Sequence, residues 1–480
     1  MKISVIGAGY VGLTTAACLS QIGHEVFCSE SDAEKLNKLQ SGVMPLFEPY
    51  LQEIVENVRA ANRLQFGATE DAIDWGRAIF ICVGTPPLAN GDADLSAIER
   101  VARMIAKRAS GYRLVIEKST VPVQTGARVR KHLAIHSTNG LDCDVASNPE
   151  FLREGSAVGD FLHPDRIVVG TDSTRAANLL REIYEPVIRQ TFGCPIHELC
   201  PKTTQPRFLV TDTSSAELIK HASNSFLAMK ISFINMVANL CEVVGGDVTQ
   251  VAEGIGLDPR IGSAFLKPGI GFGGFCFPKD IQAFVRIADK AGCDFSLLKE
   301  VEKINMRRIE HFAEKVRKEL WSLQNKKLAV WGLAFKPNTD DVRFAPAIAL
   351  LKLLVEEGAT INAYDPVAKE KAKLVLPNIN YCNDAYDAAQ GADAILIVTE
   401  WEEFREVDWD RTRKSVERPL IFDGRNMLDA KEMAGLGFDY VGVGQAPVIP
   451  MRTPAGLDSG ATVSQYERET VASGVRGVHK

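Results

Sequence analysis

Short apolar runs alternate with stretches of helical periodicity over roughly the first 150 residues. Each run ends in polar or glycine-rich residues, as strands buried on both faces do. The runs are KISVIG (2–7), EVFCSE (25–30), AIFICVG (78–84), RLVIEKST (113–120) and DVASNP (144–149). They predict a parallel sheet with crossover helices, in which ligand-binding residues lie at the carboxyl ends of the strands.

The pattern changes near Ser214 to long amphipathic helices at 215–245 and 248–257, with no strand between them. A further helix is expected at roughly 296–323. At 327 the alternation resumes, and the new apolar runs are KLAVWGLAF (327–335), TINAYDP (360–366), AILIVTE (394–400) and LIFDG (420–424). These runs predict a second α/β region.

The fold class expected from these patterns is α/β, with two Rossmann-like parallel-sheet domains joined by a helical middle domain. The expected boundaries are 1–213, 214–325 and 326–445, and the segment 446–480 lacks periodicity and is expected to be a flexible tail. GRAIFICVGTP (76–86) and GADAILIVTEW (391–401) share a small-residue turn, an apolar strand and a threonine. This similarity suggests a duplicated nucleotide-binding unit.

Composition narrows the kinds of partner. The 480 residues are 46% hydrophobic with a net charge of −6, so no general attraction to nucleic acid or acidic lipid is expected and a small molecule is the favoured partner. The strand at residues 3–9 leaves no room for a signal peptide, and no apolar run was found to approach the ~20 residues of a membrane span. We therefore expect a cytoplasmic protein.

Ten cysteines are scattered without a CxxC pair, which is usual for a reducing compartment. The nearest thing to a metal cluster is Cys194, His197 and Cys200. Their spacing differs from that of common zinc sites, so we predict an ordinary loop there and no metal.

GAGYVG at residues 7–12 directly follows a strand and opens an apolar helix. Gly7 permits the tight turn, Gly9 lets the backbone approach a pyrophosphate, and Gly12 allows close packing of helix and strand. Glu30 ends the next strand, where its carboxylate suits the ribose hydroxyls of NAD and repels the extra phosphate of NADP. The context predicts NAD as cofactor.

Three further places carry side chains suited to catalysis. Thr85, Ser119 and Thr120 follow strands, where either turn capping or cofactor contact explains them. Lys220 and Asn224 lie four apart on one helix face. In GFGGFCFPKD (271–280), clustered glycines let the chain wrap a ligand, and the ammonium of Lys279 could lower the thiol pKa of Cys276 towards neutrality, although a cysteine alone is more often core filler.

Taken together, the motifs resemble those of the UDP-glucose/GDP-mannose dehydrogenase family over roughly residues 1–445. Besides GAGYVG and GFGGFCFPKD, the segments that carry the resemblance are CVGTP (82–86), KSTVPV (118–123), SNPEFLREG (147–155), PDRIVVG (164–170), SAELIKHASNSFLA (215–228), DPRIG (258–262), GLAFKPNTDDVR (332–343) and DGRN (423–426).

The resemblance implies oxidation of a sugar's primary alcohol to a carboxylate, with two NAD consumed per substrate. Cys276 would add to the intermediate aldehyde, and the resulting thiohemiacetal would be oxidised to a thioester that water hydrolyses. By the same resemblance Lys220 and Asn224 would steady the oxyanion, while Asp280 and Thr120 would handle the water. Glu150 would be the general base and Glu154 would lie between substrate and nicotinamide, with the division of roles between the two left open.

The resemblance also implies binding residues. Cofactor contacts are expected from Gly7, Gly9, Tyr10, Val11, Gly12, Glu30, Lys35, Thr85, Pro86, Thr120, Glu154 and Arg343. Substrate contacts are expected from Glu150, Phe151, Leu152, Arg153, Glu154, Lys220, Asn224, Arg260, Phe265, Leu266, Lys267, Gly273, Phe335, Lys336 and Arg425. Arg260 resembles a residue supplied to a neighbouring subunit, so a homodimer or higher homo-oligomer is implied.

Five positions depart from the family pattern. Glu30 stands where aspartate is commoner, Phe275 replaces a serine, Gln124 and Tyr50 replace glycines, Phe344 replaces an acid, and the stretch around 198–208 looks like an insertion. UDP-glucose is the expected substrate. GDP-mannose, a UDP-N-acetylhexosamine, a two-electron hydroxy-acid or 6-phosphogluconate-like oxidation, and a non-enzymatic NAD-binding regulator remain alternatives.

Overall fold

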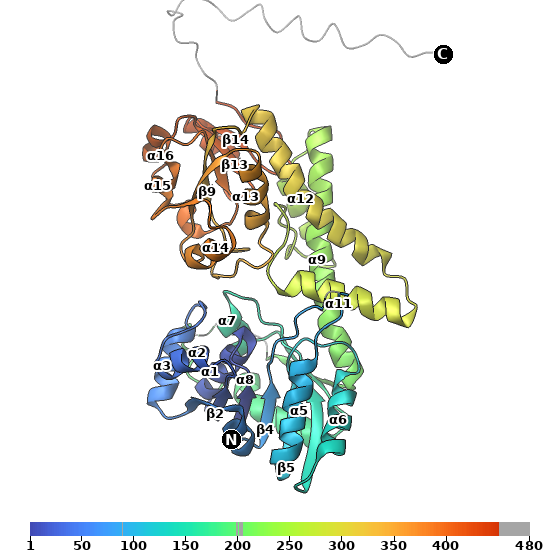
Figure 1. The fold of residues 1–480 in the computed structure, drawn as a ribbon. Coiled ribbons are helices and arrows are strands. Elements are labelled where there is room, and N and C mark those ends of the chain that lie inside the picture. Colours follow the sequence, from blue (N-terminus) through green and yellow to red (C-terminus); the bar gives the residue numbers. More distant parts are fainter. Residues whose placement is uncertain (89, 198–199, 201–204, 451–480) are drawn as a thin grey trace, which may run out of the picture.

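A computed structural model describes residues 1–88, 90–197, 200 and 205–450. The expected tail at 446–480 therefore lies almost wholly outside the described residues. The chain forms two α/β lobes connected by long helices, with α11 lying at the junction of the lobes (Figure 1). The predicted fold class is confirmed.

The first lobe contains an eight-stranded sheet in the order β3-β2-β1-β4-β5-β6-β7-β8. All neighbouring strands are parallel except β6 and β7. The strands are β1 (Lys2–Ile6), β2 (Glu25–Ser29), β3 (Leu64–Gly67), β4 (Ala78–Ile81), β5 (Gly111–Glu117), β6 (Leu141–Ser147), β7 (Arg166–Gly170) and β8 (Arg207–Thr211). The five strands predicted by apolar runs are present.

Helices cover both faces of this sheet. Residues of one strand alternate between the two hydrophobic clusters: Ile3 and Val5 of β1 join one cluster and Ile6 joins the other. This explains why the strands read as continuous apolar runs. The helices are α1 (Tyr10–Gln21), α2 (Ala33–Gln40), α3 (Leu51–Ala60), α4 (Thr69–Trp75), α5 (Ser96–Arg108), α6 (Thr125–His136), α7 (Ala157–Leu162) and α8 (Thr174–Arg189).

Four helices form the middle of the chain: α9 (Thr213–Val244), α10 (Val248–Gly256), α11 (Cys276–Ala291) and α12 (Ser296–Leu320). The predicted helices at 215–245, 248–257 and 296–323 are confirmed, each with slightly shifted ends. At 1.5 Å per residue, the 32 residues of α9 span about 48 Å and run beside both lobes (Figure 1).

The helix α9 contradicts the expectation that no apolar run approaches the length of a membrane span. Its most apolar stretch has a mean hydropathy of 1.5, so by length and composition it is the one helix in the described part of the chain that could cross a membrane. However, it buries Glu217, Lys220, His221 and Asn224 inside the protein. These polar side chains, together with its packing against α11 and α12, show that one face of the helix is packed inside the protein.

The second lobe has a six-stranded parallel sheet in the order β11-β10-β9-β12-β13-β14. Its strands are β9 (Lys327–Trp331), β10 (Thr360–Tyr364), β11 (Asn380–Tyr381), β12 (Ala394–Ile397), β13 (Leu420–Asp423) and β14 (Asp439–Val441). Its helices are α13 (Pro346–Glu356), α14 (Lys369–Val375), α15 (Ala385–Ala389), η1 (Glu402–Phe404), α16 (Trp409–Ser415) and α17 (Ala430–Gly435).

The suspected duplication has a topological counterpart. The segments 76–86 and 391–401 contain β4 and β12, and each of these strands pairs with the first strand of its own sheet. The inner strand order is therefore the same in both lobes.

Candidate active site

The glycine-rich loop before Cys276 is pressed against the second lobe. Gly271 and Gly274 have φ angles of 109° and 78°, which side chains rarely adopt. A Cβ on Gly273 would lie 2.3 Å from the carbonyl oxygen of Phe344, and one on Gly274 would lie 2.8 Å from the ring of Phe335. The glycines therefore allow the loop to pass close to the second lobe and to deliver Cys276 to the start of α11.

Buried charges and an amide surround Cys276. The ammonium of Lys220 lies 2.8 Å from Oε1 of Glu150. Asn224 Nδ2 donates to Oδ2 of Asp280 at 2.6 Å, and Nζ of Lys279 lies 2.7 Å from the other oxygen. Helices α9 and α11 thus bring together the residues that the sequence singled out.

The thiol is not activated in the way that the sequence suggested. Burial raises the pKa of Cys276 to about 12, and the negative charges of Asp280 and Glu150 add to this effect. Lys220 lowers the pKa but does not offset them. The predicted shift of the thiol pKa towards neutrality was therefore wrong for the free protein, because the sequence revealed neither the loss of solvent around the sulfur nor the carboxylates near it.

Lys220 and Asp280 both keep their charges. Burial lowers the pKa of Lys220, but Glu150 and Asp280 outweigh it, so the pKa is raised overall. Burial conversely raises the pKa of Asp280, but Lys279 and Lys220 outweigh it and the net pKa is lowered. The site therefore holds an ammonium and a carboxylate side by side in a largely buried setting.

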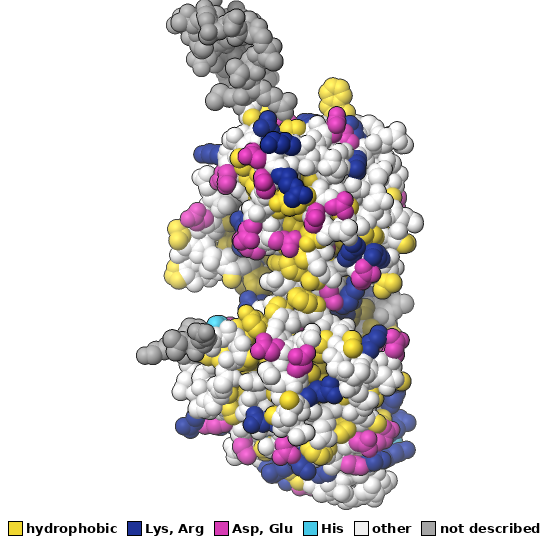
Figure 2. Space-filling view, turned by 90° about the vertical axis from the view of Figure 1, so that its left-hand side faces the viewer, with side chains coloured by type: hydrophobic (Ala, Val, Ile, Leu, Met, Phe, Trp, Pro, Cys, Tyr) yellow, Lys and Arg dark blue, Asp and Glu magenta, His cyan; other side chains and the backbone are white. Residues whose placement is uncertain are grey.

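Glu154 differs in that it titrates near neutrality. Burial and the negative charge of Asp341 raise its pKa to about 7, against the lowering effect of Arg343 and Lys336. Its oxygens lie 3.4 Å from Oγ1 of Thr339 and 3.6 Å from Nη2 of Arg343. Glu154 therefore meets the second lobe across the junction, where Figure 2 shows a notch between the lobes.

The glycine turn at the start of α1 fits a dinucleotide. A Cβ on Gly12 would lie 1.8 Å from the carbonyl oxygen of Gly7, so only glycine permits this packing. Gly9 has open space where its Cβ would be, and as N-cap it leaves the first turn of α1 without a side-chain cap. Free backbone N–H groups facing open space suit a pyrophosphate. Beside them, Val11 packs against the core.

Glu30, directly after β2, stays ionised. Its carboxylate accepts hydrogen bonds from the backbone N–H groups of Ser31 and Asp32, and its other oxygen lies 2.8 Å from Nζ of Lys35. Burial raises the pKa of Glu30, but Lys35 and these N–H groups outweigh it, so the net pKa is lowered. A fixed negative charge at this position fits NAD better than NADP.

The sequence left open whether Thr85, Ser119 and Thr120 cap turns or contact the cofactor. The structure shows two of them capping turns. Ser119 donates to the carbonyl of Val83 at 2.8 Å, and Thr85 donates to the carbonyl of Thr120 at 2.8 Å, so both stabilise turns. Pro86 is exposed and its carbonyl accepts from Asp94 N–H.

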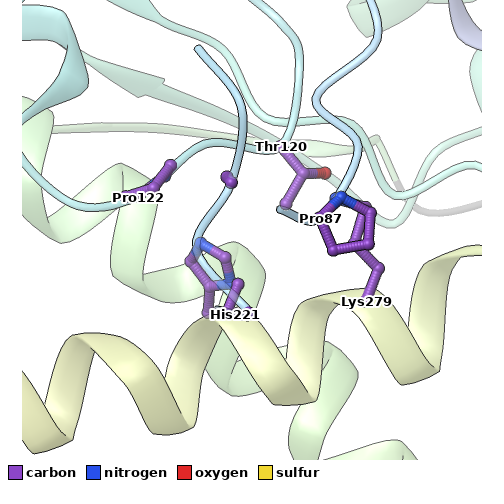
Figure 3. A pocket seen from close by; sticks show the side chains of 8 residues that line it. Pro87, Thr120, Pro122, His221 and Lys279 are labelled. Atoms are coloured by element: carbon purple, nitrogen blue, oxygen red, sulfur yellow. The ribbon is translucent and has the colours of Figure 1, made fainter. Parts of the chain in front are cut away.

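The side chain of Thr120 instead lines a pocket at the junction. Figure 3 shows Thr120 and Pro87 from the first lobe facing His221 and Lys279 from α9 and α11. The pocket adjoins the buried group, because Lys279 is the ion-pair partner of Asp280.

Sequence reasoning missed Glu48. Its carboxylate accepts hydrogen bonds from the hydroxyl of Tyr10 and from the backbone N–H groups of Gly155 and Ala157. Glu48 therefore fixes the loop that carries Glu154 against the cofactor turn. Tyr50, two residues later, was noted as a departure from the family pattern, but the long-range partners of Glu48 could not be read from the sequence.

The expected substrate residues of the first lobe and the middle region lie in different settings. Leu266 is buried and Lys267 exposed, and the ring of Phe265 lies 6.2 Å from that of Phe277. Leu152 N–H donates to Glu150 at 2.6 Å.

Three other expected substrate residues are held by contacts within the chain. The guanidinium of Arg166 lies over the ring of Phe151. Arg153 is paired with Asp160. Arg260 is 87% exposed at its side chain and is paired with Asp258.

The second lobe supplies cations to the junction. Arg425 donates to the carbonyls of Phe335 and Gly271, and so ties β13 to the glycine loop. Burial lowers the pKa of Lys336. The guanidinium of Arg343 lies 4.5 Å from the ring centre of Phe275, so the phenylalanine that replaces a serine holds a predicted cofactor ligand by a cation–π contact.

The two parallel sheets, of the kind that bind nucleotides, and the match to an NAD binding domain define the class of protein as an NAD-dependent dehydrogenase with two α/β domains. The chain belongs to the UDP-glucose/GDP-mannose dehydrogenase family. The family's NAD binding domain matches residues 1–188, its central domain residues 214–307, and its UDP binding domain residues 329–430.

Curated relatives and solved structures support the same family. A UDP-glucose 6-dehydrogenase of Bacillus subtilis is 44% identical, covering 94% of this chain and 99% of the relative. One of Rhizobium meliloti is 43% identical, covering 93% and 100%. A UDP-glucose dehydrogenase structure from Pyrobaculum islandicum has a TM-score of 0.82 at 36% identity and covers 92% of this chain and 98% of its own.

A further structure shows that the same fold serves another sugar. A UDP-D-ManNAc dehydrogenase from Pyrococcus horikoshii has a TM-score of 0.78 at 28% identity, covering 93% of this chain and 99% of its own. The fold therefore defines the family but does not by itself select the sugar.

Proposed function

We propose that the protein oxidises the 6-hydroxymethyl group of UDP-glucose to the carboxylate of UDP-glucuronate in two successive two-electron steps. The observation that carries the proposal is Cys276, partly buried beside Lys220, Asn224 and Asp280 between the matches to the family's NAD binding and UDP binding domains. Bound NAD supplies the hydride acceptor for each step.

Cys276 takes part in three steps, namely addition to the aldehyde, oxidation of the adduct and hydrolysis of the thioester. The Cys276 thiol adds across the aldehyde carbonyl, so that sulfur bonds to carbon and the proton ends on oxygen. Loss of a hydride and a proton from this thiohemiacetal gives a thioester. Water then attacks the acyl carbon, the carbon–sulfur bond breaks, and the thiol is regenerated with the acid.

The buried charges suit particular roles in this sequence. The ammonium of Lys220 and the amide of Asn224 stabilise negative charge on the substrate oxygen. The ionised Asp280 orients the hydrolytic water, and the Thr120 hydroxyl lines the neighbouring pocket and helps to hold it.

The two glutamates are assigned different tasks. Glu150 is paired with Lys220, so it positions the ammonium. Glu154 has a pKa of about 7 and is the better suited to take and return a proton near neutral pH. This division sharpens the expectation from the sequence, which left it open.

Substrate recognition is assigned to the junction. Phe265, Leu266, Lys267 and Gly273 belong to the segment that would wrap the nucleotide sugar. Lys336 and Arg425 supply positive charge for the diphosphate from the second lobe. The ring of Phe335 contacts both sides of the junction: Nζ of Lys336 lies 5.4 Å from its centre, and a Cβ on Gly274 would lie 2.8 Å from the ring.

A panel of nucleotide sugars tests the substrate. With NAD, UDP-glucose should give the highest kcat/KM, while GDP-mannose and UDP-N-acetylhexosamines should react at least about tenfold more slowly. A higher kcat/KM for one of those sugars would replace the UDP-glucose assignment and leave the family unchanged.

We also propose a homo-oligomer formed through α9. One face of this helix exposes large apolar side chains, namely Phe226, Phe233, Met236, Leu240 and Val244. A second copy covering this stripe would bury it and could use the exposed Arg260. Leu240→Glu should shift the mass measured by light scattering towards the monomer, whereas Leu374→Glu, at another exposed leucine, should not.

Location and domain boundaries remain proposals. We propose a cytoplasmic protein, which cell fractionation would test. We also propose domains at 1–213, 214–325 and 326–445. Their support is that α9 begins at Thr213 and β9 at Lys327, and limited proteolysis would test them.

A further inference from the structure

Two histidines and two cysteines converge in the first lobe, and none of them belongs to the group of residues around Cys276. They are His163, Cys194, His197 and Cys200, and their ligand atoms all lie within 4.8 Å of one another. The sequence drew attention to the last three and favoured an ordinary loop. It missed His163, which caps α7 more than thirty residues earlier and completes a four-ligand set.

The measured separations match those of a tetrahedral zinc site. Nε2 of His163 lies 3.2 Å from Sγ of Cys194 and 3.8 Å from Sγ of Cys200, and Sγ of Cys194 lies 3.6 Å from Nδ1 of His197. With Zn–S near 2.3 Å and Zn–N near 2.0–2.1 Å, tetrahedral angles place sulfur and nitrogen ligands about 3.6 Å apart. The three measured values scatter around that figure.

The chain holds these ligands in place through other contacts. Gln21 donates to the carbonyl of Gly193 at 2.9 Å, which ties the loop after α8 to α1. Phe192 and Ile196, on either side of Cys194, pack against the hydrophobic core. These anchors direct Cys194 and His197 towards His163 without help from a metal.

A second observation concerns the other ring nitrogen of His163. Nδ1 is buried and lacks a close hydrogen-bond partner, and so does Oε1 of Gln190. The Gln190 side chain nevertheless interacts with the His163 ring, and its amide nitrogen is held by the carbonyls of Leu162 and Val187. An N–H donating to such an oxygen is the outer contact that orients a metal-bound imidazole.

We propose that His163, Cys194, His197 and Cys200 bind one Zn²⁺ as a closed structural site. Two thiolates and two imidazoles are a ligand set typical of structural zinc, and four protein ligands leave no position for substrate. The metal would fasten the segment after α8 to the end of α7, which follows the loop that carries Glu150 and Glu154. Residues 198–199 and 201–204 play no part in the proposal.

Metal analysis of the full chain tests the proposal. Tag-free protein, purified with thiols reduced and passed into metal-free buffer, should contain about one zinc per chain by inductively coupled plasma mass spectrometry. Cys194→Ser and His163→Gln should each lose most of it. Cys293→Ser, which removes an exposed cysteine between α11 and α12, is the matched control and should keep it.

Two further readouts do not depend on activity. Replacement of zinc by Co²⁺ should give the thiolate charge-transfer and ligand-field bands of a tetrahedral site in the wild type and not in Cys194→Ser. Removal of zinc by a chelator should lower the Tm of the wild type and leave that of Cys194→Ser unchanged.

Three results would overturn the proposal. One is reduced wild-type protein that contains no zinc and takes none up from micromolar zinc. Another is a disulfide between Cys194 and Cys200 in freshly purified protein, seen as the loss of two hydrogens in the linked peptides. The third is a zinc content that falls equally in Cys293→Ser.

Discussion

At the scale of single residues, the environment of Cys276 decides how the proposed nucleophile behaves. Cys276 is partly buried, and its sulfur is exposed to the negative charges of Asp280 and Glu150, which Lys220 opposes. A thiol in this setting stays protonated until an electrophile arrives. This protects the free protein from oxidation and non-specific alkylation.

The pKa of about 12 gives a measurable consequence. Iodoacetamide labelling of Cys276 in the free protein, followed by peptide mass spectrometry, should speed up about tenfold per pH unit between pH 7 and 10, because the thiolate fraction rises in that proportion. Exposed Cys293 supplies the internal control for a cysteine labelled without burial. A labelling rate at Cys276 that levels off near pH 7 would contradict the raised pKa.

Glu154 gives a second prediction at this scale. Since its pKa is raised to about 7, the proton-accepting form is lost as the pH falls through 7, and kcat/KM should fall with it. Glu154→Gln should lower kcat about 100-fold and remove this acidic limb from the pH profile. Glu53→Gln, at an exposed position on α3, should leave the profile unchanged. A limb that persists in Glu154→Gln would assign the titration to another group.

At the scale of elements, three departures from the family pattern, Tyr50, Gln124 and Phe344, fall where the backbone is left-handed, and the first two begin helices. Gln124 is the N-cap of α6 with φ 75°, and Tyr50 is the N-cap of α3 with φ 65°. The resemblance places glycine at both positions, and the structure supplies the physical reason, because glycine adopts such angles without strain. The chain tolerates Gln124 partly because its N–H donates to Glu217 at 2.6 Å.

Gln124→Gly should therefore stabilise the protein. The backbone N–H and its bond to Glu217 are kept while the left-handed strain is removed, and we expect a gain of about 0.5–1 kcal/mol after the extra chain entropy of glycine is subtracted. Thermal unfolding of Gln124→Gly and the control Gln124→Ala checks this. Only the glycine variant should show a raised Tm, and an equal rise in both would point to loss of the side chain instead.

Apolar runs predicted nine of the fourteen described strands, and helical periodicity predicted α9, α10 and α12, because strands covered on both faces and long helices leave clear patterns. The strand β7 was missed although most of its residues are buried. The strand β3 was missed because only Leu64 of its four residues is buried. The strand β8 was missed because none of its residues is fully buried. The apolar character of α9 was underestimated because the helix mixes a polar active-site face with an exposed apolar one.

The site was predictable where chemistry is local and hidden where it depends on distant partners. The motifs identified Cys276, Lys220, Asn224 and Asp280, and the structure brings them together. No local signal linked Glu48 to the loop of Glu154, or His163 to Cys194, because these contacts join segments far apart in the chain. The charge balance around the thiol was hidden for the same reason.

At the scale of the whole molecule, the active site is assembled from all three parts of the chain. The first lobe carries the proposed cofactor turn and Glu154, α9 and α11 carry the proposed nucleophile Cys276 and its charged neighbours, and the second lobe supplies Arg425 and Lys336. The glycine loop passes so close to Phe344 that the second lobe shapes the cysteine site directly. A covalent intermediate suits such a junction, because the bound sugar stays in place while the cofactor is exchanged.

The most direct test of the central claim counts electrons per sugar. With limiting UDP-glucose and excess NAD, the wild-type protein should form two NADH for each UDP-glucuronate, and Cys276→Ser should form no acid while still binding both ligands. NADH measured by absorbance and acid measured by mass spectrometry in the same sample give the ratio. One NADH per sugar, or full acid formation by Cys276→Ser, would contradict the covalent four-electron account.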